Sequence, residues 1–322
     1  MKKLISVLLA AVLILGCFTA CGAGSSPNGD RLQIVTTIFP AYDWVRSVLG
    51  GNPANAELTM LLDNGVDLHS YQPTAEDIMK ISTCDLFIYV GGESDAWVAD
   101  ALKQATNEKM IVLDLLDVLG DQAKEEEAVE GMQVEEEEEE EEEIEYDEHV
   151  WLSLRNAAVF VSSISDALQK IDPANAAHYQ SCASDYTAKL NALDGEYRAA
   201  VDAAGFKTLL FGDRFPFRYL ADDYGLDYYA AFSGCSAETE ASFETVIFLA
   251  GKLDELRLPV VMTIDGSDHR IAETIIQGTQ TKDQQILSMD SMQSTTAKDV
   301  QEGANYLAVM EKNLTALKGA LG

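Results

Sequence analysis

Short apolar runs alternate with helical patterns along most of this 322-residue chain, and this alternation restricts the fold more than any other feature. Strands separated by helices usually pair in parallel, with the helices covering the faces of the sheet. We therefore predict an α/β fold with two doubly wound parallel sheets. The expected strands are Gln33–Phe39, Glu57–Leu62, Leu86–Val90 and Met110–Leu115 in one half, and Thr208–Gly212, Leu226–Ala231, Pro259–Ile264 and Gln285–Met289 in the other.

The longest helical pattern lies between the two halves. Asp172 is a suitable N-cap, Pro173 suits the first helical position, and Gly205 is a suitable stop. Apolar residues recur between them at alternating steps of four and three, which gives one apolar stripe. A helix of ~32 residues would be roughly 48 Å long. We predict a rigid connecting helix at 173–204, a first lobe at 31–172, and a second lobe at 205–322 whose last helix spans Asp299–Leu317.

One acidic stretch carries half of the chain's net charge of −32. Between Asp121 and Glu148 there are 17 acidic residues and one basic residue, and Glu135–Glu143 is an unbroken run. Like charges repel and cannot bury apolar surface, so we predict a solvated, disordered loop at 121–147. The stretch is either a surface charge run beside an incidental histidine, His149, or a loop that gathers cations beside a metal ligand. The charge argues against a nucleic-acid partner and favours a divalent metal ion.

The first residues have the form of an export signal. A basic start precedes an apolar run, Leu4–Leu15, that is too short to span a bilayer. A small residue before a cysteine resembles a bacterial lipobox, in which the cysteine is lipidated. We favour Cys21, with Cys17 as the alternative. We thus predict a lipoprotein signal peptide at 1–21, a flexible tether at 22–30, and an extracytoplasmic protein that is lipid-anchored to the bacterial cell membrane. The other interpretation is a soluble secreted protein.

Three cysteines follow the predicted signal, an odd number without metal-type spacing. Cys84 has the sequence context of a buried thiol at a strand edge. An exported protein permits a disulfide between Cys182 and Cys235, and the sequence leaves that pairing open.

Candidate ligand residues follow several of the predicted strands. In open parallel sheets, ligands bind beyond the carboxyl ends of the strands. Imidazole combined with carboxylate is a ligand set for zinc or manganese, and carboxylates shift the preference toward manganese. The two remaining histidines are expected at the surface. The candidates are His69 and His149 in the first half, and Asp213, Asp265 and Asp290 in the second.

Several motifs occur together along the chain. They are Thr36–Trp44, Asp67–Pro73 (Asp-Leu-His-Ser-Tyr-Gln-Pro) and Glu148–Leu152 (Glu-His-Val-Trp-Leu), followed by Asp172–Asn175, Tyr179, Tyr219-Leu220 and Tyr224–Leu226. In this order they resemble the zinc and manganese solute-binding lipoproteins of bacterial ABC transporters, over residues 31–322. The resemblance implies two lobes joined by a long helix, with one metal ion in the cleft between them.

The resemblance also assigns metal ligands. It makes His69 and His149 the ligands of the first lobe and Asp290 a fourth ligand. The bound ion would be Zn(II), as transported ligand, with Mn(II) as the alternative. Glutamates stand where zinc members of the family often carry a histidine-rich loop, and oxygen ligands prefer harder ions.

The third ligand is where this chain departs from the family. The family usually has a histidine or glutamate after the first strand of the second lobe. A gapless alignment puts Arg214 there, which cannot bind a metal, and a shift of one residue offers Asp213. We expect Asp213 to be the third ligand and Arg214 to pair with Glu238 or Glu240. In the alternative, Asp213 pairs with Arg214 or caps the following helix.

These features predict a metal receptor that captures one Zn(II) or Mn(II) ion and delivers it to an ABC permease in the membrane. We expect a monomer that is not an enzyme. The sequence has no His-Glu-x-x-His motif, no Gly-x-Ser-x-Gly elbow and no phosphate loop. Two alternatives are a surface adhesin with a structural metal and a metallohydrolase that uses the same histidines.

Overall fold

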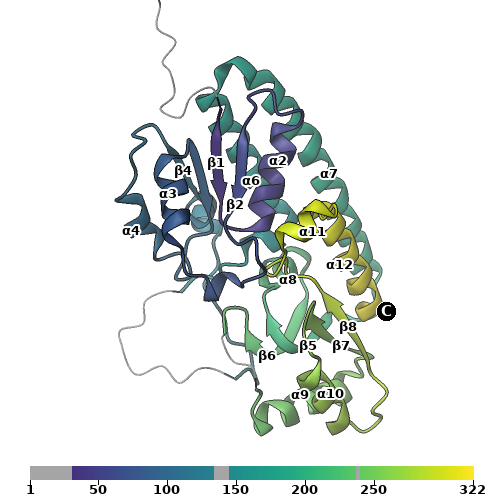
Figure 1. Ribbon diagram of the computed structural model, residues 1–322. Helices are drawn as coiled ribbons and strands as arrows, with labels where there is room; N and C mark the ends of the chain where they lie inside the picture. The colour runs from purple at the N-terminus through teal and green to yellow at the C-terminus, as the bar shows by residue number, and fades with distance from the viewer. Residues whose placement is uncertain (1–30, 134–144, 237–239) are drawn as a thin grey trace, which may run out of the picture.

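The computed structural model describes residues 31–133, 145–236 and 240–322 (Figure 1). The predicted signal peptide at 1–21, the tether at 22–30, and the lipidation candidates Cys17 and Cys21 lie outside the described residues, as does Glu135–Glu143. Within the described ranges, no helix is both long enough and apolar enough to cross a membrane.

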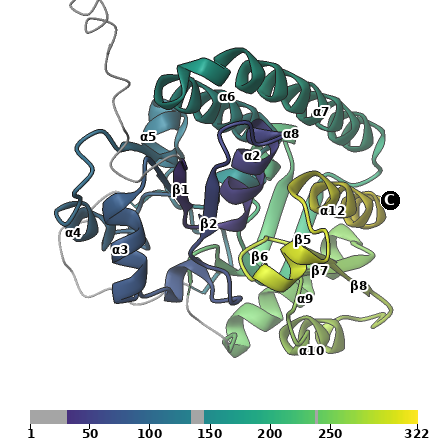
Figure 2. The same ribbon diagram turned by 45° about the horizontal axis from the view of Figure 1, so that its top comes forward.

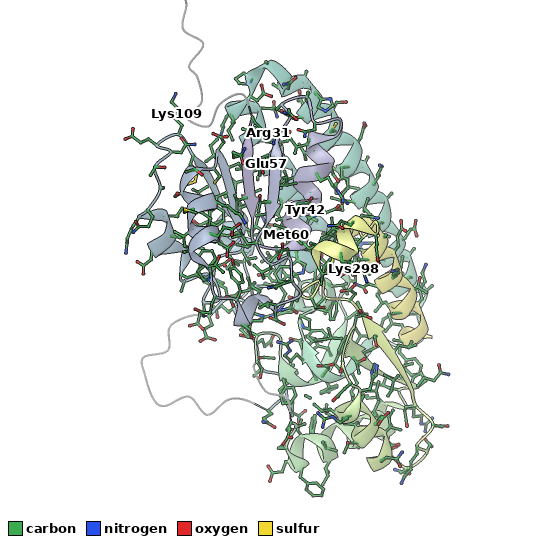
Figure 3. All side chains as sticks on the ribbon, in the orientation of Figure 1. Arg31, Tyr42, Glu57, Met60, Lys109 and Lys298 are labelled. Carbon is green, nitrogen blue, oxygen red and sulfur yellow. The ribbon has the colours of Figure 1, made fainter. Side chains whose placement is uncertain are left out.

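The first half of the chain forms a four-stranded parallel sheet with the strand order β2-β1-β3-β4. Consecutive residues of β1 and β3 are buried, so both faces of these strands are covered. Arg31 and Glu57 pair at the amino ends of the strands, and Met60 ends β2 on the side of the second half (Figure 3). The strands are β1 (Gln33–Thr36), β2 (Glu57–Met60), β3 (Leu86–Tyr89) and β4 (Ile111–Asp114), and the helices are α2 (Phe39–Leu49), α3 (Ala75–Thr83), α4 (Val98–Leu102), α5 (Leu115–Leu119) and α6 (Leu154–Ile171).

A long helix follows the first half. A 3-10 turn, η4 (Pro173–Asn175), leads into α7 (Ala176–Ala203), which runs beside both halves (Figure 1). The Asp172 carboxylate makes no hydrogen bond to the helix backbone. It accepts hydrogen bonds from the side chains of Asn175 and Tyr179 instead. The apolar stripe is buried, and it consists of Tyr179, Ala183, Tyr186, Leu190, Leu193, Tyr197 and Val201.

The second half forms another parallel sheet, with the order β6-β5-β7-β8. The predicted last helix is split in two, because Gly303 has a φ of +102° and the Asn305 side chain caps a new helix at the N–H of Ala308. The predicted fold class is otherwise confirmed. The strands are β5 (Thr208–Phe215), β6 (Asp227–Ser233), β7 (Val260–Ile264) and β8 (Gln285–Met289), and the helices are α8 (Arg218–Tyr224), α9 (Phe243–Leu256), α10 (Arg270–Gly278), α11 (Ala297–Gln301) and α12 (Tyr306–Leu321).

One hydrophobic core extends through both halves, and a second, smaller core lies within the second half, around α9 and α10. The larger core includes residues of both sheets together with α7 and α12. Figure 2 shows α12 beside α7, with α2 close by, and these three helices are in contact. At the start of α12, Tyr306 donates its backbone N–H to Asp43 of α2 and its hydroxyl to the carbonyl of Trp151. The lobes are therefore packed together beside the site described next.

Candidate metal centre

Two of the predicted ligands, His69 and His149, lie side by side although 80 residues separate them in sequence. His69 lies in η1 (Leu68–Ser70), a turn after β2 that is capped by the Asp67 carboxylate. His149 immediately precedes η3 (Val150–Leu152). The two Nε2 atoms are 3.3 Å apart, and His149 is fully buried. The structure thus brings together the two histidines of the first lobe.

Two adjacent carboxylates orient the histidine rings. His149 Nδ1 lies 2.9 Å from Asp147 Oδ1, and His69 Nδ1 lies 3.4 Å from Glu148 Oε2 and 2.7 Å from Ser94 Oγ. Burial would raise the pKa of Glu148, but its hydrogen bonds with His69 and Ser94 hold that pKa below its usual value. Because an ionised carboxylate only accepts hydrogen bonds, His149 Nδ1 carries a proton, whereas the Ser94 hydroxyl can either donate to His69 Nδ1 or accept from it. Both Nε2 atoms face the same space, which is the arrangement of metal-binding histidines when Nδ1 is protonated.

Two glycines leave room for these side chains. Gly92 has a φ of +77°, and a β-carbon there would lie 2.4 Å from Glu148 Oε1. A β-carbon on Gly234 would lie 2.9 Å from His149 Cε1 and 3.0 Å from the carbonyl oxygen of Phe215. The positions of the His149 ring and the Glu148 carboxylate therefore require glycine at both places.

A cysteine of the second lobe joins the histidines. Cys235 follows β6, and one ligand atom each from His69, His149 and Cys235 lie within 4.8 Å of one another. Burial raises the pKa of the Cys235 thiol, and the negative charge of Glu126 raises it further. We did not predict this residue, because the cysteine spacing carries no metal signature. Its position at the carboxyl end of a parallel strand was the available signal.

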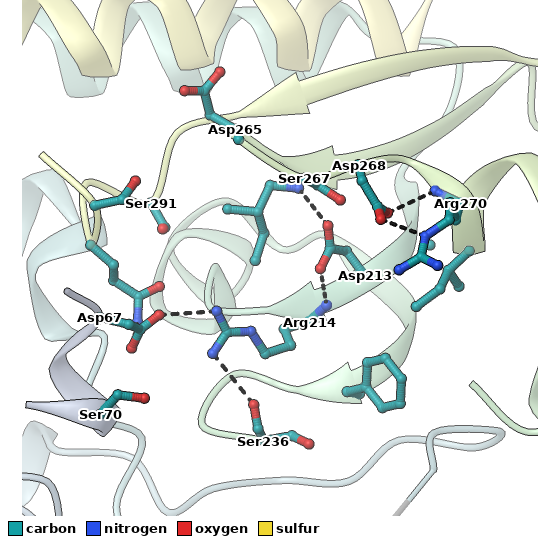
Figure 4. Close-up of a pocket in the computed structure, with 17 residues that line it drawn as sticks. Asp67, Ser70, Asp213, Arg214, Ser236, Asp265, Ser267, Asp268, Arg270 and Ser291 are labelled. Carbon is teal, nitrogen blue, oxygen red and sulfur yellow. Dashed lines mark hydrogen bonds and ion pairs between the residues drawn. The ribbon is translucent and has the colours of Figure 1, made fainter. Parts of the chain in front are cut away.

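The structure places Asp213 inside a strand and outside the group that contains the two histidines. β5 continues through an irregularity between Phe211 and Arg214, so Asp213 lies inside the strand instead of following it. Its carboxylate accepts hydrogen bonds from the backbone N–H groups of Arg214 at 2.9 Å and Ile264 at 3.1 Å (Figure 4). Asp213 thus holds β5 to β7, at the wall of a pocket of about 620 Å³ between the lobes.

Arg214 connects the two lobes. Its guanidinium pairs with Asp67 of the first lobe, at 3.0 Å, and not with Glu240 as expected; Glu238 lies outside the described residues (Figure 4). A second nitrogen donates to the carbonyl oxygen of Ser236 at 3.4 Å. Burial would raise the pKa of Asp67, but the Arg214 charge holds it below its usual value. Arg214 therefore ties the η1 turn to the loop after β6.

Asp290 also lies outside the histidine group. It follows β8 as predicted, its N–H donates to the Asn313 side chain at 2.8 Å, and its Oδ1 accepts from the N–H of Met292 at 2.7 Å. Burial raises its pKa, and the charge of the nearby Asp265 adds to this effect. The cluster of ligand-type side chains found in the described parts of the chain contains neither Asp290 nor Asp213. The structure does not bring the two predicted carboxylate ligands to the histidines.

The acidic stretch has paired backbone at both of its ends, within residues 121–133 and 145–147, and the disorder of 121–147 stays a prediction. Glu125 bridges to Tyr146, and the N–H of Glu126 donates to the carbonyl of Glu145. The Glu126 carboxylate accepts from the N–H of Cys235 at 3.2 Å. These hydrogen bonds offset the charge repulsion. A pocket of about 260 Å³ lies here, lined by His69, Glu93, Ser94, Glu126, Glu145, Tyr146, Glu148 and Cys235.

The other cysteines and histidines have local partners. Cys84 is buried, and Cys182 Sγ lies 3.6 Å from His178 Nε2. All three cysteines of the described ranges are free, so Cys182 and Cys235 do not form a disulfide. His269 Nδ1 lies 3.1 Å from a threonine hydroxyl of β7. Neither His178 nor His269 belongs to the group around His69.

The chain belongs to the ZnuA family, described as zinc-uptake complex component A, periplasmic, which matches residues 34–320.

The names of individual relatives match the description of this family. The zinc-binding lipoprotein AdcA of Streptococcus pneumoniae is 32% identical over 322 residues, which cover 99% of this chain and 61% of that protein. The high-affinity zinc uptake system protein ZnuA of Bacillus subtilis is 27% identical over 320 residues, 96% of each chain. The crystal structure of the Zn(II)-bound ZnuA-like domain of S. pneumoniae AdcA matches with a TM-score of 0.70 at 28% identity, over 90% of this chain and 99% of that one. The chain thus spans about three fifths of the AdcA relatives.

Proposed function

We propose that this protein is the metal-binding receptor of a zinc importer, which captures one Zn(II) ion at His69 and His149 and delivers it to a membrane permease. The histidine pair carries the proposal, since its two Nε2 atoms lie 3.3 Å apart with both rings held from behind. With Zn–N bonds of about 2.0–2.1 Å, two nitrogen ligands of a tetrahedral site lie about 3.3–3.4 Å apart. The rings therefore already have the spacing of zinc ligands.

The relatives support zinc as the cargo. AdcA and ZnuA are named for zinc binding and zinc uptake, and the family description places its members in the periplasm. We extend to this chain an ABC permease as partner, a location outside the cytoplasm, and a lipid anchor at Cys21, with Cys17 as the alternative. In this role zinc is transported and the protein is a receptor, not an enzyme. That the protein is a monomer stays a prediction. The surface adhesin and the metallohydrolase stay alternative predictions of its function.

Removal of either histidine tests the assignment. We expect His69→Ala and His149→Ala each to weaken Zn(II) binding at least ~100-fold, since loss of a direct ligand should exceed the 10–100-fold cost of losing a supporting group. Binding would be measured by competition with a chromophoric chelator on metal-stripped protein. His178→Ala is the matched control and should keep wild-type affinity. Wild-type affinity in either ligand variant would overturn the assignment, and absence of tight zinc binding by the wild type would overturn the function.

A further inference from the structure

We propose that Cys235 is the third protein ligand of the zinc ion, so that the metal is held by two imidazoles of the first lobe and one thiolate of the second. This inference rests on the proposed zinc-binding function and adds a ligand type and a metal preference to it.

The geometry of the three side chains carries the proposal. Zn–S bonds of about 2.3 Å and Zn–N bonds of about 2.0–2.1 Å give sulfur–nitrogen separations of about 3.5–3.6 Å in a tetrahedron. All three ligand atoms already lie within 4.8 Å of one another. The remaining adjustment is on the order of 1 Å, within the reach of a side-chain rotation or a small loop shift. The fourth position of the tetrahedron is left to water.

The surrounding contacts hold Cys235 at this place. Its N–H donates to Glu126 at 3.2 Å, and the next residue, Ser236, accepts from Arg214 through its carbonyl oxygen at 3.4 Å. Gly234 permits the close approach of the loop to the His149 ring. The loop after β6 is therefore fastened on both sides of the cysteine with its thiol beside the histidines.

Three nearby carboxylates have other contacts. Asp147 and Glu148 orient the rings of His149 and His69 through their Nδ1 atoms. Asp213 accepts two backbone hydrogen bonds within the second lobe. Among the described residues, the group of possible metal ligands consists of His69, His149 and Cys235. Cys235 is the member of this group that comes from the second lobe.

The chemistry of binding follows from these ligands. As the Zn–S bond forms, the S–H bond of Cys235 breaks and its proton passes to solvent, while both histidines bind through Nε2 lone pairs. Two neutral imidazoles and one thiolate leave one positive charge on the zinc centre, and the buried Asp147 and Glu148 carboxylates lie behind it. Thiolate is a soft ligand that suits zinc and disfavours manganese. The site should thus discriminate against Mn(II), although the chain around it is rich in carboxylates.

Cobalt substitution tests the ligand directly. We expect the Co(II)-loaded wild type to show a thiolate-to-cobalt charge-transfer band in the near ultraviolet, and Cys235→Ser to lack it. Zn(II) affinity of Cys235→Ser should fall at least ~100-fold, by the same reasoning as for the histidines, while the weak Mn(II) affinity should change little. Cys182→Ser is the control and should keep both the band and the affinity. Circular dichroism would confirm that each variant is folded, and Cys235→Ala serves as a second variant.

The outcomes separate the two proposals. One outcome is that the wild type binds zinc tightly and shows no charge-transfer band, while Cys235→Ser keeps the same Zn(II) affinity. That result would overturn the thiolate ligand and leave the receptor function standing. Absence of tight zinc binding by the wild type, with the two histidine variants equally inert, would instead overturn the receptor function.

Discussion

Asp147 and Glu148 are neighbours in sequence, yet each supports a different histidine. Asp147 contacts the ring of His149, and Glu148 contacts the ring of His69. Both carboxylates are almost completely buried. A buried carboxylate has lost its hydration and is stabilised by a positive charge nearby. A divalent cation at the Nε2 atoms would compensate both charges, so the residues that fix the rings also favour a cation over a neutral ligand.

A third buried acid, Asp95, should make the stability of the protein depend on pH. Its Oδ2 accepts from the N–H groups of Val90 and Gly91, and its Oδ1 has no hydrogen-bond partner in the described part of the chain. Burial raises its pKa to about 7, and the Glu148 charge adds to this. Between the unfolded pKa near 4 and this value, the folded state holds a proton that the unfolded state has released. The free energy of unfolding should therefore fall as pH rises.

Asp95→Asn should remove that fall, because the amide keeps an acceptor for the two N–H groups and cannot ionise. Between pH 5 and pH 7.5 we expect wild type to lose roughly 2–3 kcal/mol relative to the variant, measured by urea denaturation of the metal-free proteins. Asp100→Asn is the control, because Asp100 is exposed and its Lys103 partner lowers its pKa, out of this pH window. Parallel curves for wild type and Asp95→Asn would contradict the prediction.

The site residues differ in how far the sequence could reveal them. His69 and His149 are recognisable because each lies in a short motif whose neighbours are also fixed, such as the Asp67 cap. The place of Asp213 in the fold could not be predicted, because the irregularity in β5 extends the strand past the expected end. Cys235 belongs to no motif. Its role depends on the approach of a second-lobe loop to two first-lobe histidines, which only the three-dimensional fold shows.

At the scale of elements, the acidic stretch contributes Glu126 and Glu145 to the wall of the pocket beside His69 and Cys235. Its two ends pair with each other, and Gln133 pairs with Phe232 of β6. Deletion from residue 125 onward would therefore remove the contact between Glu126 and Cys235 as well as charge. A test of cation gathering should leave residues 121–133 and 145–147 in place.

Glu145→Gln provides such a test at the rim of the pocket. Four glutamates line this pocket, so its negative potential should attract divalent cations. We expect Glu145→Gln to slow Zn(II) association several-fold at low ionic strength and to leave dissociation nearly unchanged, measured by stopped-flow with a zinc-responsive dye. Glu108→Gln is the charge-matched control, because Glu108 precedes β4 and so lies toward the amino ends of the parallel strands, whereas the pocket lies beyond their carboxyl ends. Equal association rates for the two variants would rule out steering by the pocket.

The helices and strands themselves were largely predictable. Alternating apolar runs specify parallel strands, and local caps such as Thr74 with Asp77 specify where helices begin. The errors lie at element ends, where tertiary contacts decide. Asn305 starts a helix inside a continuous apolar pattern, and residues 121–133 gain hydrogen bonds that their charge alone does not predict.

At the scale of the whole molecule, the two sheets and the long helix form one packed unit. Asp43 is a buried junction of that unit, because it accepts hydrogen bonds from Arg46 of its own helix, from the Tyr186 hydroxyl of α7 and from the N–H of Tyr306 in α12. Burial raises its pKa, and these hydrogen bonds and the charge of Arg46 counteract the rise.

Asp43→Ala should destabilise both lobes together. The change removes the acceptor of two buried donors, the Tyr186 hydroxyl and the Tyr306 N–H, which typically costs about 1–3 kcal/mol for each donor left unpaired. Arg46 is partly exposed and keeps its hydrogen bond to the Ala304 carbonyl. We expect calorimetry to show a single transition at a lower temperature. Asp43→Asn should lose less, since its amide oxygen can still accept from Tyr306. A second-lobe transition unchanged beside a weakened first-lobe transition would contradict the shared core.

The junction at Asp43 also bears on how the chain reaches its folded state. The Asp43 carboxylate and the N–H of Tyr306 are 263 residues apart in sequence. Native contacts of such long range form slowly, and until α7 and α12 are available the buried acid of helix α2 has only Arg46 of its own helix as a partner. A nascent first lobe would thus remain incomplete through most of its synthesis. This delay suits a polypeptide that is threaded across a membrane in unfolded form and folds on the far side.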